Sequence, residues 1–299
     1  MLCVGTCSRS LNDTNDKTMK KTLLTAASLA LLTISSQAAI VNGLVNYWTF
    51  DGDLVDHAHG APGSASTNAD DGVFGGANGT AGISYVAGVS GSAIGLDGAA
   101  GAAQDNGHVI ISRSPDTLFG GTGAHAANSV TTSVWVTIGG DDTGWQTVLS
   151  HGEGNQYRVA MRGASNVPGY AGGSGEGPDN GPDITGGDWH NIIAISDGVA
   201  GNTRLYVDGV LTSTGGAPAI NDAQGAPALL DFYIGGNPNT GAQTREWFGN
   251  IDDVAQWNRP LTDLEIAAVA GGAAILVPEP STSILMGLSG IALMFRRRR

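Results

Sequence analysis

Carboxylates are the reactive side chains that this sequence offers most often. Residues 39–272 contain 24 acidic and 6 basic side chains, a local charge of −18. Glycoside hydrolysis needs two carboxyl groups held across one glycosidic bond. The four glutamates of this region form no closely spaced array: Glu153, Glu176, Glu246 and Glu265. We therefore predict that the protein is not a glutamate-based glycosidase and assign no catalytic residue, although chemistry based on aspartate stays open.

Two further patterns point to chemistry but lack a necessary part. The segment Asp-Gly-Asp-Leu-Val-Asp at 51–56 begins like an EF-hand calcium loop. However, Val55 and Asp56 occupy the positions where a ligand and then a glycine are needed. His57 and His59 have no evident third metal ligand, so we expect a solvated pair. No Gly-x-Ser-x-Gly nucleophile elbow occurs in a strand–turn–helix context.

The charge balance and the cysteines limit the classes of partner. An acidic surface repels nucleic acid, because phosphate binding needs basic residues that displace counterions. The same surface is compatible with divalent cations or with neutral sugars, or it simply keeps an exported domain soluble. Both cysteines, Cys3 and Cys7, precede residue 19, so the remaining chain has neither a disulfide nor a thiolate metal site.

The N-terminal residues are typical of a secretion signal. Met19-Lys-Lys21 is a short basic start and Thr22–Ile34 is an apolar stretch. Small residues then allow signal peptidase to cleave between Ala38 and Ala39. We predict a signal peptide at 19–38. Residues 1–18 are polar and fit no part of this pattern, so we expect them to be a gene-model extension.

The C-terminal end combines a proline-rich motif, an apolar run and a basic close. A linker at 273–281 contains Pro278-Glu279-Pro280-Ser281, and an almost wholly apolar run, 282–295, precedes four arginines. A helix over this run is about 21 Å long, short of a bilayer core of about 30 Å. We predict a thin transmembrane helix and basic tail at 282–299, with the arginines cytoplasmic and the preceding domain outside.

This tail resembles the PEP-CTERM sorting signal of Gram-negative bacteria, with Pro278, Glu279, Pro280 and Ser281 as the motif. The resemblance implies recognition by an exosortase, a membrane-bound cysteine transpeptidase-like enzyme, and removal of the tail near Ser281. It also implies export through the inner membrane, a transient membrane tether and final placement at the cell surface or outside, in a cell that makes exopolysaccharide. The alternative is an ordinary tail anchor with a chance Pro-Glu-Pro.

Short strands must position any functional side chain within 39–272. Turn signals at regular intervals separate them, a pattern typical of a β-sandwich or barrel. The expected strands are Leu44–Phe50, Ala93–Leu96, His108–Ser112, Ser129–Ile138, Gln146–Ser150, Tyr157–Met161, His190–Ser196, Arg204–Val207, Val210–Ser213, Phe232–Ile234 and Gly249–Asn258. Asp208-Gly209 is a strong hairpin signal. Thr262-Asp-Leu-Glu265 is a capping box that opens a helix over Leu264–Val269.

Several segments resemble the laminin-G-like jellyroll, a concanavalin A-like sandwich. They follow the order of that family over most of the region: 43–52, 88–98, 133–136, 145–152, 188–192, 205–210, 234–238 and 248–266. The resemblance implies an all-β, two-sheet antiparallel jellyroll sandwich over 39–272 with a short C-terminal helix. The segments at 57–80 and 164–187 are longer and richer in glycine than this pattern.

The aromatic residues have two interpretations. Five of them lie in strand contexts, where a sandwich of this size needs large inward side chains. We expect these five to pack in the core: Trp48, Trp135, Trp189, Tyr206 and Trp257. Tyr170 lies in a glycine-rich segment that we expect to be a loop. There it could stack on a sugar ring, although a lone loop tyrosine is more often incidental.

The laminin-G resemblance also implies a structural cation site. In that family a cation can tie the end of the first strand to the last strand, and the matching residues here are Asp51 and Asp252, with Asp253 and loop carbonyls. Carboxylate oxygens suit calcium. The alternative is that Asp51 belongs to a turn and that Asp252 and Asp253 bond neighbouring backbone groups.

Three functions are compatible with these features. The first is a non-catalytic binding or adhesion domain at the cell surface that engages a glycan, such as extracellular polysaccharide, or a surface protein. The second is a carbohydrate-active enzyme with unfamiliar active-site residues. The third is a structural component of the extracellular matrix without a defined ligand. The sandwich alone does not choose among them, since one fold hosts many functions.

Overall fold

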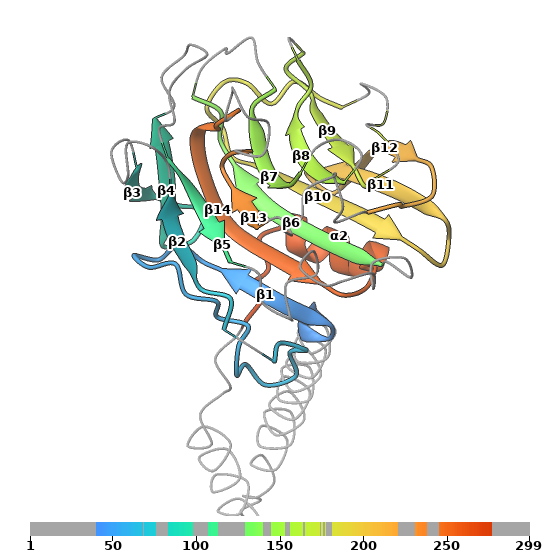
Figure 1. Ribbon diagram of the computed structural model, residues 1–299, viewed down its shortest axis with the longest axis horizontal. Helices are drawn as coiled ribbons and strands as arrows, with labels where there is room; N and C mark the ends of the chain where they lie inside the picture. The colour runs from blue at the N-terminus through green and yellow to red at the C-terminus, as the bar shows by residue number, and fades with distance from the viewer. Residues whose placement is uncertain are drawn as a thin grey trace, which may run out of the picture.

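The computed structural model describes residues 40–67, 69–75, 83–97, 107–112, 129–139, 145–152, 156–163, 165–173, 175, 177, 181–220, 231–237 and 245–276. Within these ranges, two antiparallel sheets face each other (Figure 1). The expected all-β sandwich is therefore confirmed. The predicted signal peptide, the Pro-Glu-Pro-Ser motif and the predicted transmembrane segment lie outside the described residues. Among the residues that are described, no helix is both long and apolar enough to span a membrane.

The first and the last strand of the domain, β1 and β14, both belong to the larger sheet. Its eight strands in the described ranges are, in spatial order, β12 (Val210–Gly215), β11 (Asn202–Val207), β10 (His190–Asp197), β6 (Val130–Val136), β14 (Phe248–Trp257), β4 (Ser92–Asp97) and β3 (Ile83–Ala87), with β1 (Leu44–Trp48) also paired to β14. β1 and β4 follow one another along the same side of β14. The first and last predicted strands are therefore neighbours.

The second sheet has six strands in the described ranges, and it includes most of the unexpected ones. Its order is β2 (Gly72–Gly75), β5 (His108–Ile111), β13 (Phe232–Ile234), β7 (Thr147–His151), β8 (Tyr157–Met161) and β9 (Pro168–Ala171). β2, β3 and β9 were not predicted. β2 and β9 lie inside the two glycine-rich segments, where low strand propensity hides strands that cross-strand pairing stabilises.

Two apolar clusters hold the sheets and the helix together. The first lies between the sheets and contains Trp48, Phe232 and Trp247, which are almost fully buried. Each buried indole finds a partner for its N–H: Trp48 donates to the carbonyl of Asp70 and Trp247 to the carbonyl of Thr137. Burial therefore leaves no unpaired donor on these two rings.

The second cluster covers the outer face of the larger sheet. Helix α2 (Asp263–Ala270) packs there beside β10 (Figure 1), and Trp257 is buried in the same cluster as the helix residues Ile266 and Val269. The Nε1 of Trp257 donates to the carbonyl of Ile40 at 2.6 Å, and Ile275 is buried in the same cluster. The fold therefore anchors the chain at Ile40 and again at Ile275, beyond the predicted end of the domain at 272.

Candidate functional site

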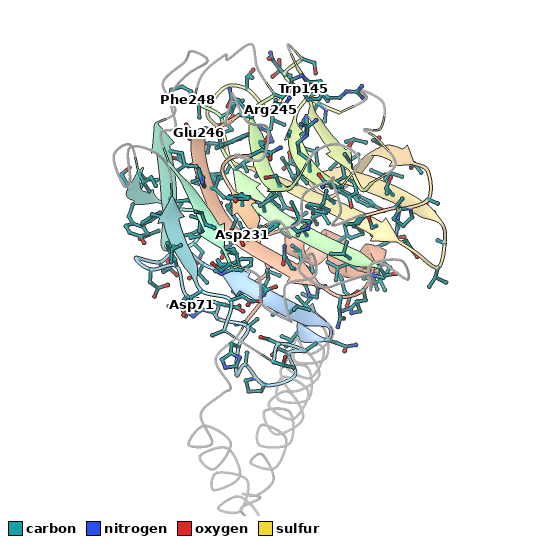
Figure 2. The ribbon with its side chains drawn as sticks, in the orientation of Figure 1. Asp71, Trp145, Asp231, Arg245, Glu246 and Phe248 are labelled. Carbon is teal, nitrogen blue, oxygen red and sulfur yellow. The ribbon has the colours of Figure 1, made fainter. Side chains whose placement is uncertain are left out.

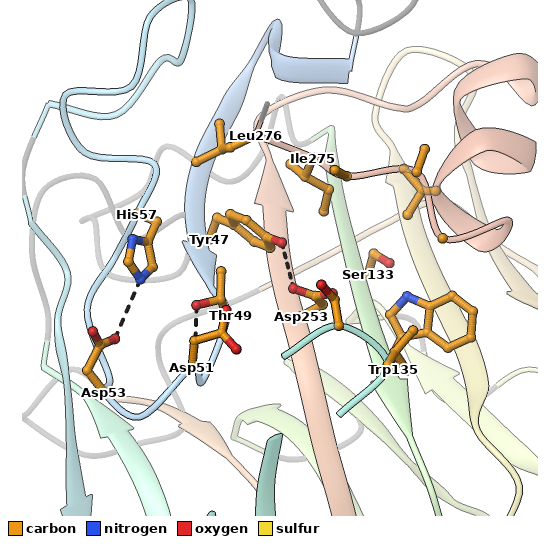
Figure 3. Close-up of a pocket in the computed structure, with 16 residues that line it drawn as sticks. Tyr47, Thr49, Asp51, Asp53, His57, Ser133, Trp135, Asp253, Ile275 and Leu276 are labelled. Atoms are coloured by element: carbon orange, nitrogen blue, oxygen red, sulfur yellow. Dashed lines mark hydrogen bonds and ion pairs between the residues drawn. The ribbon is translucent and has the colours of Figure 1, made fainter. Parts of the chain in front are cut away.

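A pocket of about 390 Å³ opens on the outer side of the larger sheet (Figure 3). Its walls come from the end of β1 and the residues that follow it, the β3–β4 turn, the middle of β6 and β14, and the segment after α2. The lining residues that matter most here are Tyr47, Asp51, Asp53, Trp135, Asp253 and Ile275. Residues more than 200 positions apart therefore form one site.

A β-bulge places Asp253 in the pocket. The register between β14 and β6 shifts between Asp252 and Ala255, and Asp253 has a positive φ of 47°. A bulge adds one residue to a strand and turns a side chain that would otherwise follow the alternation. Here the bulge lies where β4 ends and β1 begins along β14. It therefore directs Asp253 toward Tyr47.

Tyr47 and Asp253 form a short, partly buried hydrogen bond. The Tyr47 hydroxyl donates to Oδ1 of Asp253 at 2.5 Å. Burial, and then the charge of Asp253, raise the pKa of Tyr47 far above its ordinary value, so this tyrosine is a donor at any physiological pH. Burial also raises the pKa of Asp253, although the bond from Tyr47 opposes that shift.

Asp252 faces a different group from Asp253. Its Oδ2 accepts a hydrogen bond from the backbone N–H of Val89 at 2.8 Å, and its Oδ1 accepts from the N–H of Asp253 at 2.8 Å. The side chain is fully buried, and burial together with the charge of Asp253 raises its pKa to about 7. A Cβ at Gly88 would lie 2.3 Å from Oδ2, so the turn approaches this carboxylate closely because residue 88 is glycine.

Asp51 holds the other side of the same β3–β4 turn. Its Oδ1 accepts from the N–H of Ser92 at 2.6 Å, and a Cβ at Gly91 would lie 1.9 Å from that oxygen. Gly91 also has a positive φ of 64°, which favours glycine. Asp252 therefore accepts from a backbone N–H within the 88–91 turn, and Asp51 accepts from the N–H of Ser92 directly after it.

The structure brings together two of the three predicted calcium ligands. Asp51 and Asp253 line the pocket, and Oδ1 of each accepts one hydrogen bond, from Ser92 and Tyr47 respectively. Both oxygens of Asp252 accept from backbone N–H groups. For Asp252, the structure agrees with the alternative to a calcium site, in which the carboxylate accepts hydrogen bonds from neighbouring backbone groups. In the described ranges, no three Asp, Glu, His or Cys side chains are arranged to hold a metal ion. Calcium binding thus stays a prediction.

Asp53 and His57 add a second polar group to the pocket. The Nε2 of His57 lies 3.5 Å from Oδ1 of Asp53, and the N–H of Val55 donates to the same oxygen at 3.1 Å. The sequence pattern predicts only an incomplete EF-hand at Asp53 and a solvated side chain at His57. In the sequence, the Asp-x-x-x-His spacing just after the first predicted strand is the pattern that could have indicated this pair.

Trp135 lines the pocket instead of lying in the core. Val134 and Val136 on β6 point inward and are buried, so Trp135 points to the outer face, where it is partly exposed. Trp189 is also partly exposed, whereas Trp48, Tyr206 and Trp257 are buried as expected. The expectation for Trp135 and Trp189 was wrong because strand context does not reveal which face the helix covers.

Tyr170 is a core residue, so the expectation of a loop was wrong. It lies on β9 with 4% of its surface exposed, and its hydroxyl is 2.6 Å from Oγ of Ser196. Its ring packs edge-on against Tyr157 in the cluster between the sheets. This tyrosine therefore cannot stack on an external sugar.

Glu246 and Glu265, the two glutamates of this region that the structure describes, each lie beside a basic side chain of the fold. Glu246 is 5% exposed and its Oε1 lies 3.9 Å from Nδ1 of His108, near the start of β14 (Figure 2). Glu265 completes the predicted capping box and pairs with Arg259. Glu153 and Glu176 lie outside the described residues. Nothing in these surroundings resembles a pair of carboxyl groups across an open cleft.

Comparisons with known families match two parts of the chain. A profile of the concanavalin A-like lectin/glucanases superfamily matches residues 105–267. A profile of the PEP-CTERM protein-sorting motif matches residues 276–299, which contain the predicted motif. Among curated proteins, none matches the sequence.

Solved structures with a similar fold come from proteins of several kinds. Domain 4 of AbnA, a GH43 extracellular arabinanase from Geobacillus stearothermophilus solved in complex with arabinotriose, has a TM-score of 0.52 at 18% identity, covering 76% of this chain and 98% of that domain. Trypanosoma rangeli sialidase has a TM-score of 0.52 at 18% identity, covering 79% of this chain and 34% of the sialidase. Botulinum neurotoxin type C has a TM-score of 0.52 at 12% identity, covering 78% of this chain and 52% of the toxin chain. The chain spans only a third to a half of the last two, and the similarity shows the fold alone.

Proposed function

Since the chain belongs to the concanavalin A-like lectin/glucanase superfamily and carries a PEP-CTERM sorting motif, we propose that it is an exosortase-processed surface or matrix protein whose jellyroll domain binds glycan without cleaving it. The pocket that joins Trp135 to Asp51, Asp53 and Asp253 carries this proposal. A partly exposed indole offers a flat apolar surface to a sugar ring, and carboxylates accept hydrogen bonds from its hydroxyl groups.

Three further observations support a glycan as the ligand class. Ser133 and Thr49 add hydroxyl groups to the same pocket, and both can donate or accept. The AbnA domain, which has the same fold, was solved with arabinotriose. The sorting motif at 276–299 predicts a cell that makes exopolysaccharide, which would place the mature protein among polysaccharide chains.

A structural calcium ion forms part of this proposal. Asp51 and Asp253 would be its ligands, and Asp53 lines the same pocket. Oxygen donors of this kind suit a hard cation. Calcium would offset the repulsion among these carboxylates and tie the end of β1 to β14.

A binding assay with the mature chain tests the proposed function. The variant Trp135→Ala should lose most of its affinity for the glycan that a polysaccharide panel identifies, whereas Trp189→Ala, another partly exposed tryptophan, should keep it. Isothermal titration would measure both affinities, and thermal melting would check that both variants fold.

The same preparations distinguish the alternatives. Turnover of any polysaccharide in the panel would favour a carbohydrate-active enzyme that uses Asp51, Asp53 or Asp253. Absence of binding to every glycan, together with a matrix that collapses when the gene is deleted, would favour a purely structural component. If Trp135→Ala and the unchanged chain bind the glycan with equal affinity, the glycan site lies elsewhere on the protein.

A further inference from the structure

A second depression lies on the same face of the larger sheet as the pocket. This groove of about 330 Å³ is lined by β3, β4, the residues directly after β6, the start of β14 and Gly187. The side chains that shape it are Ser84, Val86, Thr137, Phe248 and Asn250. Asn250 is held in place because its Nδ2 donates to Oγ1 of Thr137 at 2.9 Å. Figure 2 locates the groove: Phe248, which lines it, and Asp71 lie at opposite ends of the sandwich.

A glycine keeps the floor of the groove open. A Cβ at Gly95 would lie 3.0 Å from Oγ of Ser84 and 3.1 Å from Oδ1 of Asn250. These are closer than ordinary contacts, so any larger residue would push both polar groups away. The bare backbone at residue 95 thus leaves a hydroxyl and an amide oxygen facing the same space.

The pocket and the groove are consecutive along β6. Ser133 and Trp135 line the pocket, and Thr137, two residues further, lines the groove. Alternate residues of a strand share a face and are about 6.6–6.8 Å apart, so Ser133 and Thr137 are separated by about 13 Å. β14 repeats this arrangement, with Asn250 in the groove and Asp253 in the pocket. Trp135 stands between the two ends.

We infer that the pocket and the groove form one track that binds several consecutive sugar rings of a linear polysaccharide lacking anionic groups. This inference rests on the proposed glycan-binding function and specifies its ligand. One ring stacks on Trp135, the next rings extend along β6 into the groove beside Thr137 and Asn250, and the chain continues in both directions. The site therefore binds internal segments of a polymer and needs no free chain end.

The charges along the track exclude polyanionic glycans. Asp51, Asp53, Asp253 and His57 line one end. Among the described residues, none that lines the groove is ionisable, and no Lys or Arg lines either cavity. A uronate or sulfated polymer would place like charges against these carboxylates, and the one imidazole of the pocket lining, on His57, already lies 3.5 Å from Oδ1 of Asp53. Neutral hydroxyl groups instead find acceptors at the pocket and both donors and acceptors in the groove.

A series of oligosaccharides of increasing length tests the track on the mature chain. The oligosaccharides are prepared from the neutral polysaccharide that the binding panel identifies, and an alginate series provides the anionic comparison. Affinity should rise from the monosaccharide to oligosaccharides of several rings and then level off, and alginate should not bind.

Filling the groove separates its contribution from that of the pocket. Ser84 is exposed on the edge strand β3, so Ser84→Tyr should fill the groove without disturbing the core. This variant should bind long oligosaccharides roughly tenfold more weakly, as expected for loss of one set of contacts worth about 1.4 kcal/mol, and bind the monosaccharide unchanged. The matched control is Val73→Tyr on the edge strand β2, which is 55% exposed and lines neither cavity.

The outcomes distinguish the track from the proposed function. If the chain binds a monosaccharide as tightly as a long oligosaccharide, or if Ser84→Tyr binds long chains normally, the track is wrong while glycan binding stands. Tight binding of alginate would overturn the charge argument and with it the ligand class. If no glycan binds, the proposed function and the track both fail.

Discussion

Asp252 and Asp253 are adjacent in the sequence, yet their carboxylates serve different surroundings. Asp252 follows the alternation of β14 and lies beneath the 88–91 turn, where backbone N–H groups stabilise it. Asp253 occupies the bulge and turns toward Tyr47 and the pocket. Because of a single extra residue in β14, one of the two adjacent carboxylates holds a turn in place and the other is accessible from the pocket.

At the scale of these residues, we expect calcium to stabilise the mature chain. Asp51 and Asp253 share the pocket, and a bound cation would stabilise the folded state by mass action. The melting temperature should rise when calcium is added to protein freed of metal with a chelator. Asp51→Asn should lose this rise. Asp183→Asn should retain it, because Asp183 is exposed and does not line the pocket.

The opposite result is equally informative. An unchanged melting temperature with and without chelator would show that the carboxylates of the pocket do not bind calcium. Glycan binding through Trp135 would then proceed without a cation, and the proposed function would not depend on this outcome.

At the scale of elements, helix α2 is specified by short-range contacts. Glu265 accepts from the backbone N–H of Thr262 at 2.8 Å, while its N–H donates to the hydroxyl of Thr262. Arg259 binds both carboxylate oxygens of Glu265, and its Nε donates to the carbonyl of Asn42 at 2.6 Å. This arginine therefore links the start of the domain to its last helix.

We expect the loss of this cap to destabilise the domain measurably. Thr262→Ala should cost about 1 kcal/mol, the usual value for a lost N-cap. Glu265→Ala should cost more, about 1–3 kcal/mol, because Arg259 then loses its charged partner in a partly buried position. Urea denaturation would measure both free energies of unfolding, with the exposed helix residue Leu264→Ala as a near-neutral control.

The same contacts predict in which direction the stabilisation of the fold by Glu265 changes with pH. Burial alone would raise the pKa of Glu265, but the bonds from Arg259 and Thr262 outweigh it and lower the pKa below its ordinary value. The stabilisation by Glu265 is therefore present above the ordinary glutamate pKa and is lost as the pH falls through the folded-state value. The difference in stability between the unchanged chain and Glu265→Ala should accordingly shrink in acid. A constant difference would contradict this role for the ion pair.

At the scale of the whole molecule, the pocket lies next to the route by which the chain leaves the domain. Ile275 and Leu276 form part of its wall (Figure 3), and the PEP-CTERM motif match begins at residue 276. The predicted linker leaves five residues, 277–281, before the predicted membrane segment. Fully extended, five residues reach at most about 18 Å. Until the tail is removed, the pocket would therefore lie close to the membrane.

This geometry predicts that removal of the tail exposes the glycan site. The full chain in lipid vesicles should bind a fluorescent polysaccharide more weakly than the chain released near Ser281, because the bilayer limits approach of the polymer. A flexible insertion of about twenty residues after Leu276 should restore binding to the anchored chain, since such a linker reaches well beyond the headgroups. Equal binding by anchored and released protein would show that the pocket is accessible throughout.

The sequence by itself determined the elements whose causes are local. Strand alternation, the Asp208-Gly209 hairpin and the Thr262–Glu265 cap depend on neighbours only a few residues apart, and each appears in the structure. The sorting motif is likewise a contiguous pattern, and the family match confirms it. Two strands with little apolar alternation, β2 and β9, were missed because pairing partners, not their own residues, stabilise them.

Only the tertiary structure decided which residues form the site. Alternation indicates that Trp135 and Val134 point to opposite faces, but whether the outer face is covered depends on where α2 packs. The meeting of Asp51 with Asp253 requires β1 to pair with β14 across more than 200 residues, and it requires a bulge that no local pattern announces. Contacts of such long sequence separation are set by the packing of whole sheets, so the pocket emerges only when the sandwich closes.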